Sequence, residues 1–138
     1  MEVESSNDEI RMANDESQEP LPPRVFDLEE RTATFGERVI VFVSGIRLTP
    51  TTSPLVTQLI RAATSIGANY CEADDAESKR DFRHKIGLCR KESRETKYWF
   101  RMIARAVPDS KDAARPLWQE AHELNLIFSK IRRSSEDP

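Results

Sequence analysis

The stretch that decides the fold runs from residue 78 to residue 107 and reads SKRDFRHKIGLCRKESRETKYWFRMIARAV. Its apolar side chains recur at steps of three and four, which is typical of a helix that buries one face. Ser78 followed by Asp81 is a helix-start signal, and Pro108 ends the segment because proline lacks a backbone donor. About 30 residues at 1.5 Å each predict a helix of roughly 45 Å. Its two adjacent stripes predict contacts with more than one neighbouring helix.

The same spacing predicts three further helices. Together with the segment at 78–107, they place helices over residues 27–46, 53–73, 78–107 and 112–133. Asp27 with Glu30 resembles a capping box, and Ser53 with Pro54 fits an N-cap followed by proline at the first helical position. We expect Pro116 to be tolerated within the first turn of the last helix. Because no strand pattern or hairpin turn is present, the sequence predicts an all-α, antiparallel up-and-down four-helix bundle.

The net charge of −3 conceals parts of opposite sign. Residues 1–23 carry seven acidic side chains and one basic one, with few apolar residues, so we expect a disordered acidic leader. Residues 24–138 carry 20 basic and 17 acidic side chains, which gives the expected folded domain a charge of +3. Residues 79–105 hold ten basic and three acidic side chains, a net charge of +7. One hypothesis is that the leader competes with nucleic acid for this basic segment.

Neither a membrane protein nor a disulfide scaffold fits the sequence. No apolar run approaches the roughly 20 residues that cross a bilayer, and the acidic N-terminal region does not resemble a secretory signal. Only two cysteines occur, and they form no CxxC pair. We therefore expect a cytoplasmic protein without a membrane partner.

Basic residues in the predicted third helix recur mostly at spacings of three, four or seven. They are Arg80, Arg83, Arg90, Arg94, Lys97, Arg101 and Arg105. Such a stripe is able to contact phosphates along a nucleic-acid backbone. The alternatives are a solvated face and ion pairs with carboxylates on the first two helices. Tyr98 and Trp99 beside it fit base stacking or an anchor in the core or a subunit interface.

Two residues of the predicted second helix suggest close or polar packing. Gly67 costs about 1 kcal/mol relative to alanine in mid-helix, which favours close approach of a neighbouring helix over a functional groove. Asn69 falls on the apolar stripe and needs hydrogen-bond partners if buried. Glu92 and Glu95 are the natural candidates, and such a network would fix helix pairing.

The sequence contains few residues in patterns typical of a catalytic or metal-binding site. A di-iron bundle needs two Glu-x-x-His pairs, whereas Asp81 precedes His84 and Gln119 precedes His122. Cys71 and Cys89 fit small buried hydrophobes better than nucleophiles. We therefore expect no catalytic residue, no metal and no cofactor. The remaining enzyme alternative is a metal site built from Glu72, Glu92, Glu95 and His84.

The chain resembles the small four-helix-bundle family named for the 23S rRNA intervening-sequence protein. The matching motifs are Phe26-Asp27-Leu28-Glu29-Glu30-Arg31-Thr32, Gln58-Leu59-Ile60-Arg61, Ser65-Ile66-Gly67-Ala68-Asn69-Tyr70, Glu72-Ala73, Ser78, Asp81-Phe82, Lys85, Lys91-Glu92-Ser93-Arg94-Glu95-Thr96 and Tyr98-Trp99. The resemblance covers about residues 26–133. It implies an up-and-down bundle that assembles into a pentameric ring, with no established enzymatic activity.

Founding members of that family are encoded inside insertions in rRNA genes, and a similar basic pentamer in diversity-generating retroelements contacts nucleic acid and a reverse transcriptase. The acidic leader and the Asp74-Asp75 pair depart from the family pattern. Carried over from the motifs, a structural polar network is expected from Asn69, Glu72, Lys85, Glu92, Glu95 and Tyr98.

The leading functional hypothesis is a non-enzymatic homo-oligomer whose basic third helix binds RNA or DNA backbone. The alternative is a protein-interaction scaffold without a nucleic-acid role.

Overall fold

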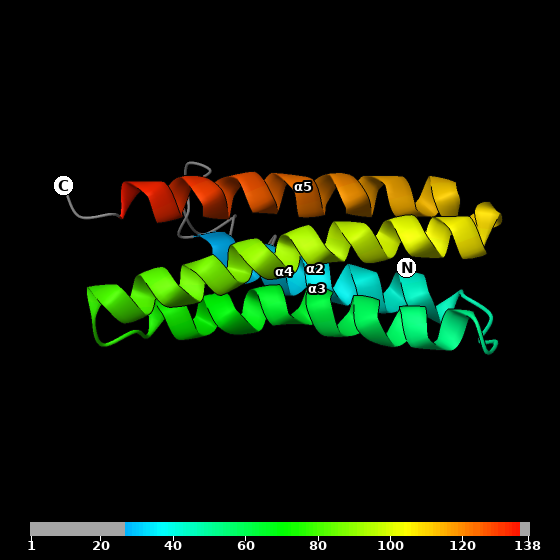
Figure 1. Cartoon of the computed structure of the whole chain (residues 1–138), viewed down its shortest axis with the longest axis horizontal. Coiled ribbons are helices and arrows are strands. Elements are labelled where there is room, and N and C mark those ends of the chain that lie inside the picture. Colours follow the sequence, from blue (N-terminus) through cyan, green and yellow to red (C-terminus); the bar gives the residue numbers. More distant parts are fainter. Residues whose placement is uncertain (1–26, 136–138) are drawn as a thin grey trace, which may run out of the picture.

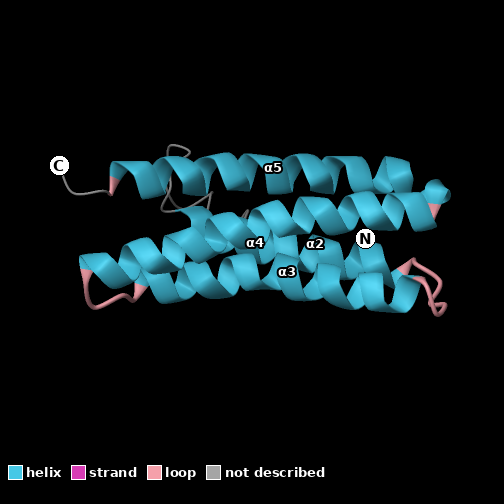
Figure 2. Ribbon diagram, in the orientation of Figure 1, coloured by secondary structure: helices cyan, strands magenta, loops and turns pink. Residues whose placement is uncertain are grey.

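The computed structural model describes residues 27–135, and the acidic leader expected at 1–23 lies outside them. Within the described residues the chain is helical, and four long helices lie lengthwise against one another (Figures 1 and 2). They are α2 (Leu28–Ser44), α3 (Thr52–Asp74), α4 (Lys79–Ala106) and α5 (Lys111–Ser134), with a short 3-10 helix, η2 (Pro108–Ser110), before α5. The all-α fold with four helices is confirmed. None of these helices is long and apolar enough to cross a bilayer.

Consecutive helices pack against one another. α4 makes its most extensive contacts with α3 and α5, whereas α2 packs on α3 and contacts α5 more sparingly. In Figure 1 the α2–α3 and α4–α5 connections lie at one end of the bundle and the α3–α4 connection lies at the other. α4 therefore lies between two partners, in agreement with its two stripes.

One continuous core joins the four helices. Its largest fully buried side chains include Phe35, Leu59, Ile66, Ile86, Phe100, Leu124 and Phe128. Two ring contacts cross this core diagonally. Phe42 of α2 meets Phe100 of α4 with ring centroids 5.6 Å apart, and Tyr70 of α3 meets Phe128 of α5 at 6.0 Å. Aromatic side chains thus connect the helix pairs whose backbones do not touch.

Gly67 allows α2 and α3 to approach closely. A Cβ atom at this position would lie 3.1 Å from Oγ1 and 3.3 Å from Cβ of Thr32. Thr32 is buried, and its hydroxyl donates to the Leu28 carbonyl oxygen at 2.7 Å. Close packing is therefore the role of Gly67, as its position in mid-helix indicates.

The helix starts agree only in part with the sequence signals. Ser78 Oγ accepts the backbone N–H of Asp81 at 3.0 Å, so the expected cap of α4 is confirmed. Asp27 makes no side-chain cap bond to α2, so the predicted capping box is wrong. The prediction of Ser53 as N-cap is also wrong, because α3 already begins at Thr52.

Threonines shape the turn before α3 instead. Thr52 Oγ1 accepts the N–H of Thr49 at 2.8 Å and donates to the Arg47 carbonyl oxygen at 2.6 Å. Thr49 Oγ1 in turn accepts the N–H of Thr52 at 3.1 Å. Short local bonds of this kind compete with a simple serine cap.

Pro116 lies deeper in α5 than expected. Because the helix begins at Lys111, the proline is past the first turn and leaves the Asp112 carbonyl without its i+4 donor. Asp112 and Pro116 are both exposed, so water can satisfy that oxygen.

Removing the α4 cap tests these assignments. Ser78→Ala should lower the free energy of unfolding by about 1 kcal/mol, because an N–H of the first turn loses its acceptor. Ser53→Ala is the matched control and should change stability by less than about 0.5 kcal/mol. Urea unfolding of the two variants measures both values, and a larger loss in Ser53→Ala would contradict the observed start of α3.

Candidate nucleic-acid interface

The seven basic residues predicted on the third helix lie along one face of α4, here called the basic stripe. Its members are Arg80, Arg83, Arg90, Arg94, Lys97, Arg101 and Arg105. Arg80, Arg94, Arg101 and Arg105 are exposed, and the other three are half-buried.

The basic stripe borders the seam between α4 and α5. Asn125 of α5 donates its Nδ2 hydrogens to the Arg90 carbonyl oxygen at 2.8 Å and to Ser93 Oγ at 3.2 Å. Lys97 Nζ lies 3.0 Å from His122 Nδ1. These three contacts across the seam involve backbone, hydroxyl and imidazole groups.

The side chain of Lys97 contacts α5 across the seam. Its Nζ lies 5.4 Å from the centroid of the Trp118 ring, and His122 stacks on that ring at 5.4 Å with an interplanar angle of 11°. A cation over an indole face gains about 0.5–1 kcal/mol at an exposed site. Lys97 therefore has a structural role as well as a charge.

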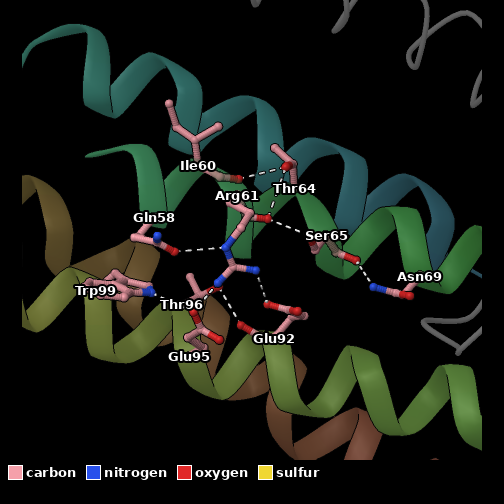
Figure 3. Close-up of polar contacts among 10 residues, drawn as sticks. All are labelled: Gln58, Ile60, Arg61, Thr64, Ser65, Asn69, Glu92, Glu95, Thr96 and Trp99. Carbon is pink, nitrogen blue, oxygen red and sulfur yellow. Dashed lines mark hydrogen bonds and ion pairs between the residues drawn. The ribbon is translucent and has the colours of Figure 1, made fainter. Parts of the chain in front are cut away.

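Glu92 and Glu95 of α4 face α3, away from the stripe. Figure 3 shows the Arg61 guanidinium of α3 between Glu92, with Nη1 to Oε1 at 3.3 Å, and Glu95, with which it also pairs. Gln58 Oε1 accepts from Arg61 Nε at 3.0 Å, and Trp99 Nε1 donates to Glu95 Oε2 at 2.9 Å. One arginine of α3 thus binds both of these acidic side chains.

Two carboxylates of α5, those of Glu120 and Glu123, pair with Arg31 of α2. Arg31 donates from Nε and Nη2 to the two Glu120 oxygens at 2.7 and 2.9 Å, and from Nη2 to Glu123 at 3.1 Å. The hydrogen bond to Glu120 raises the pKa of Arg31 above its ordinary value. A bidentate arginine–carboxylate pair is the strongest geometry for such a bond.

The basic stripe is therefore short of internal counter-charge. Among residues 27–135, six of its seven members form no ion pair with a carboxylate. These six are Arg80, Arg90, Arg94, Lys97, Arg101 and Arg105. Among the described residues, ion pairs between α3 and α4 involve Lys85, Glu92 and Glu95, which lie outside the basic stripe.

The structure divides the predicted polar network into separate pieces. Lys85 pairs with Glu72 across α3 and α4, and this hydrogen bond raises the pKa of Lys85. Glu92 and Glu95 form the separate Arg61 cluster. Asn69 joins neither, because its Nδ2 donates to the Ser65 carbonyl oxygen at 2.9 Å on its own helix (Figure 3).

Tyr98 also lies outside that network. It is 52% exposed beside the basic stripe, with its ring 5.0 Å from that of Trp99 in an edge-on arrangement. Trp99 is half-buried and packs on the core. The role of Arg61 was not predicted from the sequence, although its i, i+3 spacing from Gln58 is visible there.

The cysteines differ in environment. Cys89 is buried and its thiol donates to the Ile66 carbonyl oxygen at 3.5 Å, whereas Cys71 is exposed, so its expected burial is wrong. Burial raises the pKa of the Cys89 thiol to about 12. No group of three or more His, Cys, Asp or Glu side chains suited to a metal ion occurs within the described residues.

These environments predict selective thiol reactivity. At pH 8 a thiol reagent should modify Cys71 in the folded chain and Cys89 only after unfolding, because the thiolate is the nucleophile. The pKa of the Cys89 thiol is higher in the folded chain than in the unfolded chain. The protonated thiol therefore contributes fully to the free energy of unfolding below about pH 8.5, and this contribution is lost as pH rises towards 12. Rapid modification of both thiols in the folded protein would contradict this assignment.

An open groove lies where α4 meets the start of α5. Its volume is about 770 Å³, and Phe100, Ala104 and Trp118 supply apolar surface in it. Arg101 and Arg105 of the basic stripe line the same groove. Apolar and cationic groups are thus adjacent at this end of the molecule.

Comparisons with known proteins agree with the sequence motifs. Residues 30–130 match the model of the 23S rRNA-intervening sequence protein family. The chain is similar to a crystal structure of a protein with unknown function from the S23 ribosomal protein family of Bacteroides thetaiotaomicron VPI-5482. The two share 26% identity with a TM-score of 0.65, over 75% of this chain and 96% of the other. The search of curated proteins gives no match. Because the family model spans most of the described residues, this chain belongs to the 23S rRNA-intervening sequence protein family.

Proposed function

We propose that this chain is a non-enzymatic, homo-oligomeric, cytoplasmic protein whose basic stripe binds the phosphate backbone of RNA or DNA without strong sequence preference. The observation that carries the proposal is the separation of charge on α4. On the side that faces α3, Glu92 and Glu95 form ion pairs with Arg61. On the side that faces α5, six cations of the basic stripe have no carboxylate partner among the described residues.

The dimensions of the stripe fit an extended polyanion. Arg80 and Arg105 are 25 positions apart, so the stripe is about 38 Å long at 1.5 Å per residue. That length corresponds to about eleven base pairs at 3.4 Å per pair. Arginine side chains present several donors each and suit phosphate oxygens.

Salt dependence of binding tests the proposal. A single-stranded RNA should bind at about 50 mM salt, and each phosphate contact should contribute about −0.7 to the slope of log affinity against log salt. Five or six contacts predict a slope of about −3.5 to −4. Absence of binding to single-stranded or structured RNA at about 50 mM salt would contradict the proposal.

We also infer an antiparallel up-and-down bundle that assembles into a pentameric ring. The alternating connections in Figure 1 support the first part. Exposed apolar side chains on α2 and α5, namely Ile40, Val41 and Leu126, support contacts between copies. Light scattering should give about five times the chain mass of 15.8 kDa, and a monomeric mass would contradict the ring.

The open groove at Phe100 and Trp118 favours a second candidate function, a protein-interaction scaffold. Exposed apolar surface rimmed by cations suits a protein partner with acidic and apolar side chains. Partners that remain bound after nuclease treatment would support this function, and loss of every partner would contradict it.

A further inference from the structure

A second, smaller pocket on the bundle has one lysine and three arginines among its seven lining residues. It has a volume of about 260 Å³ and lies between α4 and the last turns of α5. We call it the basic pocket, and the residues that matter here are His84, Gly87, Arg90, Lys91, Arg94 and Arg132. Four of these side chains are permanently cationic at neutral pH, and none of the lining residues is acidic.

Gly87 makes room for the arginine that α5 contributes. A Cβ atom at position 87 would lie 3.1 Å from Nε and 3.4 Å from Cζ of Arg132. A glycine in mid-helix costs about 1 kcal/mol relative to alanine. The glycine stands at the position where the Arg132 guanidinium lies against α4, next to other cations that repel it.

Two arginines of this pocket have donors that the described chain leaves unsatisfied. The Nε atoms of Arg90 and Arg132 are buried and have no hydrogen-bond acceptor among the described residues. Neither side chain forms an ion pair within residues 27–135. A partly buried guanidinium without a counter-charge is costly, so an anion in this pocket would offset both desolvation and mutual repulsion.

We propose that the basic pocket binds a phosphate monoester, with the terminal phosphate of a nucleic-acid strand as its ligand. The identity of the strand rests on the proposed function. The pocket itself does not, because a free phosphate tests it directly.

Charge favours a monoester over the diester of a continuous backbone. A monoester carries about 1.5 to 2 negative charges at pH 7 and three terminal oxygens, whereas a diester carries one charge. Arg90, Arg94, Arg132 and Lys91 together place four positive charges around one small volume. Their attraction for a ligand grows with its charge, and arginine pairs with phosphate oxygens through two donors at once.

Two oligonucleotides that differ in one group provide the first experiment. The full-length protein is titrated with the same short RNA carrying either a 5′-phosphate or a 5′-hydroxyl, at constant ionic strength. We expect the phosphorylated RNA to bind about tenfold more tightly, because it gains charge-assisted hydrogen bonds in the basic pocket. A 3′-phosphate placed on the same RNA distinguishes the two ends of the strand.

Neighbouring arginines supply matched variants. Arg132→Ala should abolish the tenfold preference, whereas Arg133→Ala removes the same charge from an exposed position outside the basic pocket and should retain it. Gly87→Ala is a second test that raises helix propensity, so loss of folding does not explain its effect. It should also reduce the preference, because its Cβ displaces Arg132.

Inorganic phosphate tests the pocket without nucleic acid. Phosphate should raise the Tm of the wild type and of Arg133→Ala above the value in chloride at equal ionic strength, and should not do so for Arg132→Ala. A phosphate effect without any preference for phosphorylated RNA would assign the pocket to a free phosphate compound and overturn the strand end as ligand.

The remaining outcomes separate this proposal from the function on which it rests. Equal binding of the two RNAs with no phosphate effect would overturn the basic pocket and leave backbone binding intact. No RNA binding together with an Arg132-dependent phosphate effect would support the pocket and contradict the proposed function. Failure of both measurements would overturn both.

Discussion

Reversing the charge of Arg101 and Arg105 together is expected to lower the affinity for single-stranded RNA about a hundredfold at physiological salt. Non-specific complexes with six to ten phosphate contacts have dissociation constants of about 10⁻⁴ to 10⁻⁶ M, so one contact contributes somewhat more than half a decade. Arg101→Glu with Arg105→Glu removes two contacts and adds two repulsive charges. Both residues are exposed and lie outside the basic pocket, so the change alters the basic stripe and the open groove but leaves the basic pocket intact.

The chain offers a matched control for this double variant. Arg38 and Arg47 are also exposed and lie on α2 and in the turn before α3, away from α4. Arg38→Glu with Arg47→Glu changes the net charge by the same four units and should weaken binding less than about threefold. Fluorescence anisotropy with a labelled RNA measures both affinities. Equal losses of RNA affinity in the two double variants would show that binding depends only on net charge and not on the basic stripe.

Truncating Phe100 is expected to cause the largest loss of stability, about 3–5 kcal/mol. Phe100 is 1% exposed on α4, and its ring meets that of Phe42 at an interplanar angle of 64°. No backbone contact joins α2 to α4, so this side chain is part of what connects them. Phe100→Ala leaves a cavity that rigid helices on both sides cannot close, which adds to the lost burial.

Tyr98 supplies the control for that substitution on the same helix. It is 52% exposed, and Tyr98→Ala should change the free energy of unfolding by less than about 1 kcal/mol. Chemical denaturation monitored by circular dichroism gives both values. Similar losses for Phe100→Ala and Tyr98→Ala would contradict the core described for the bundle.

Helix periodicity explains how much of the fold the sequence predicts. The steps of three and four that include Leu59, Ile66 and Phe100 identify one face of each helix, and these three residues are fully buried. Helix starts are less predictable, because several side chains within one turn compete for the same backbone donors. At the start of α3, Thr49 Oγ1 accepts the N–H of Thr52, the first helical residue, and the helix therefore begins before the expected cap at Ser53.

The position of the candidate interface on α4 was predictable from the sequence, but the partners of the individual side chains were not. The spacing of the arginines places them on one face of α4 whatever the neighbours are. The partner of Asn69 was predicted wrongly because the carbonyl of Ser65, one turn earlier on the same helix, is always within reach and replaces the carboxylates of α4 as the acceptor. The basic pocket was missed because Arg132 is 45 positions from Gly87, although a glycine in mid-helix was a visible signal.

Mapping the contact surface shows whether the basic stripe of α4 touches nucleic acid. Ultraviolet crosslinking of the full-length protein to a uniformly labelled RNA, followed by mass spectrometry, identifies the peptides that touch nucleic acid. If the basic stripe binds the backbone, crosslinks are expected on α4 around Lys97 and Tyr98, at the seam with α5, and their yield should decrease as salt rises. Crosslinks confined to α2 and α3, with none on α4, would contradict binding by the basic stripe.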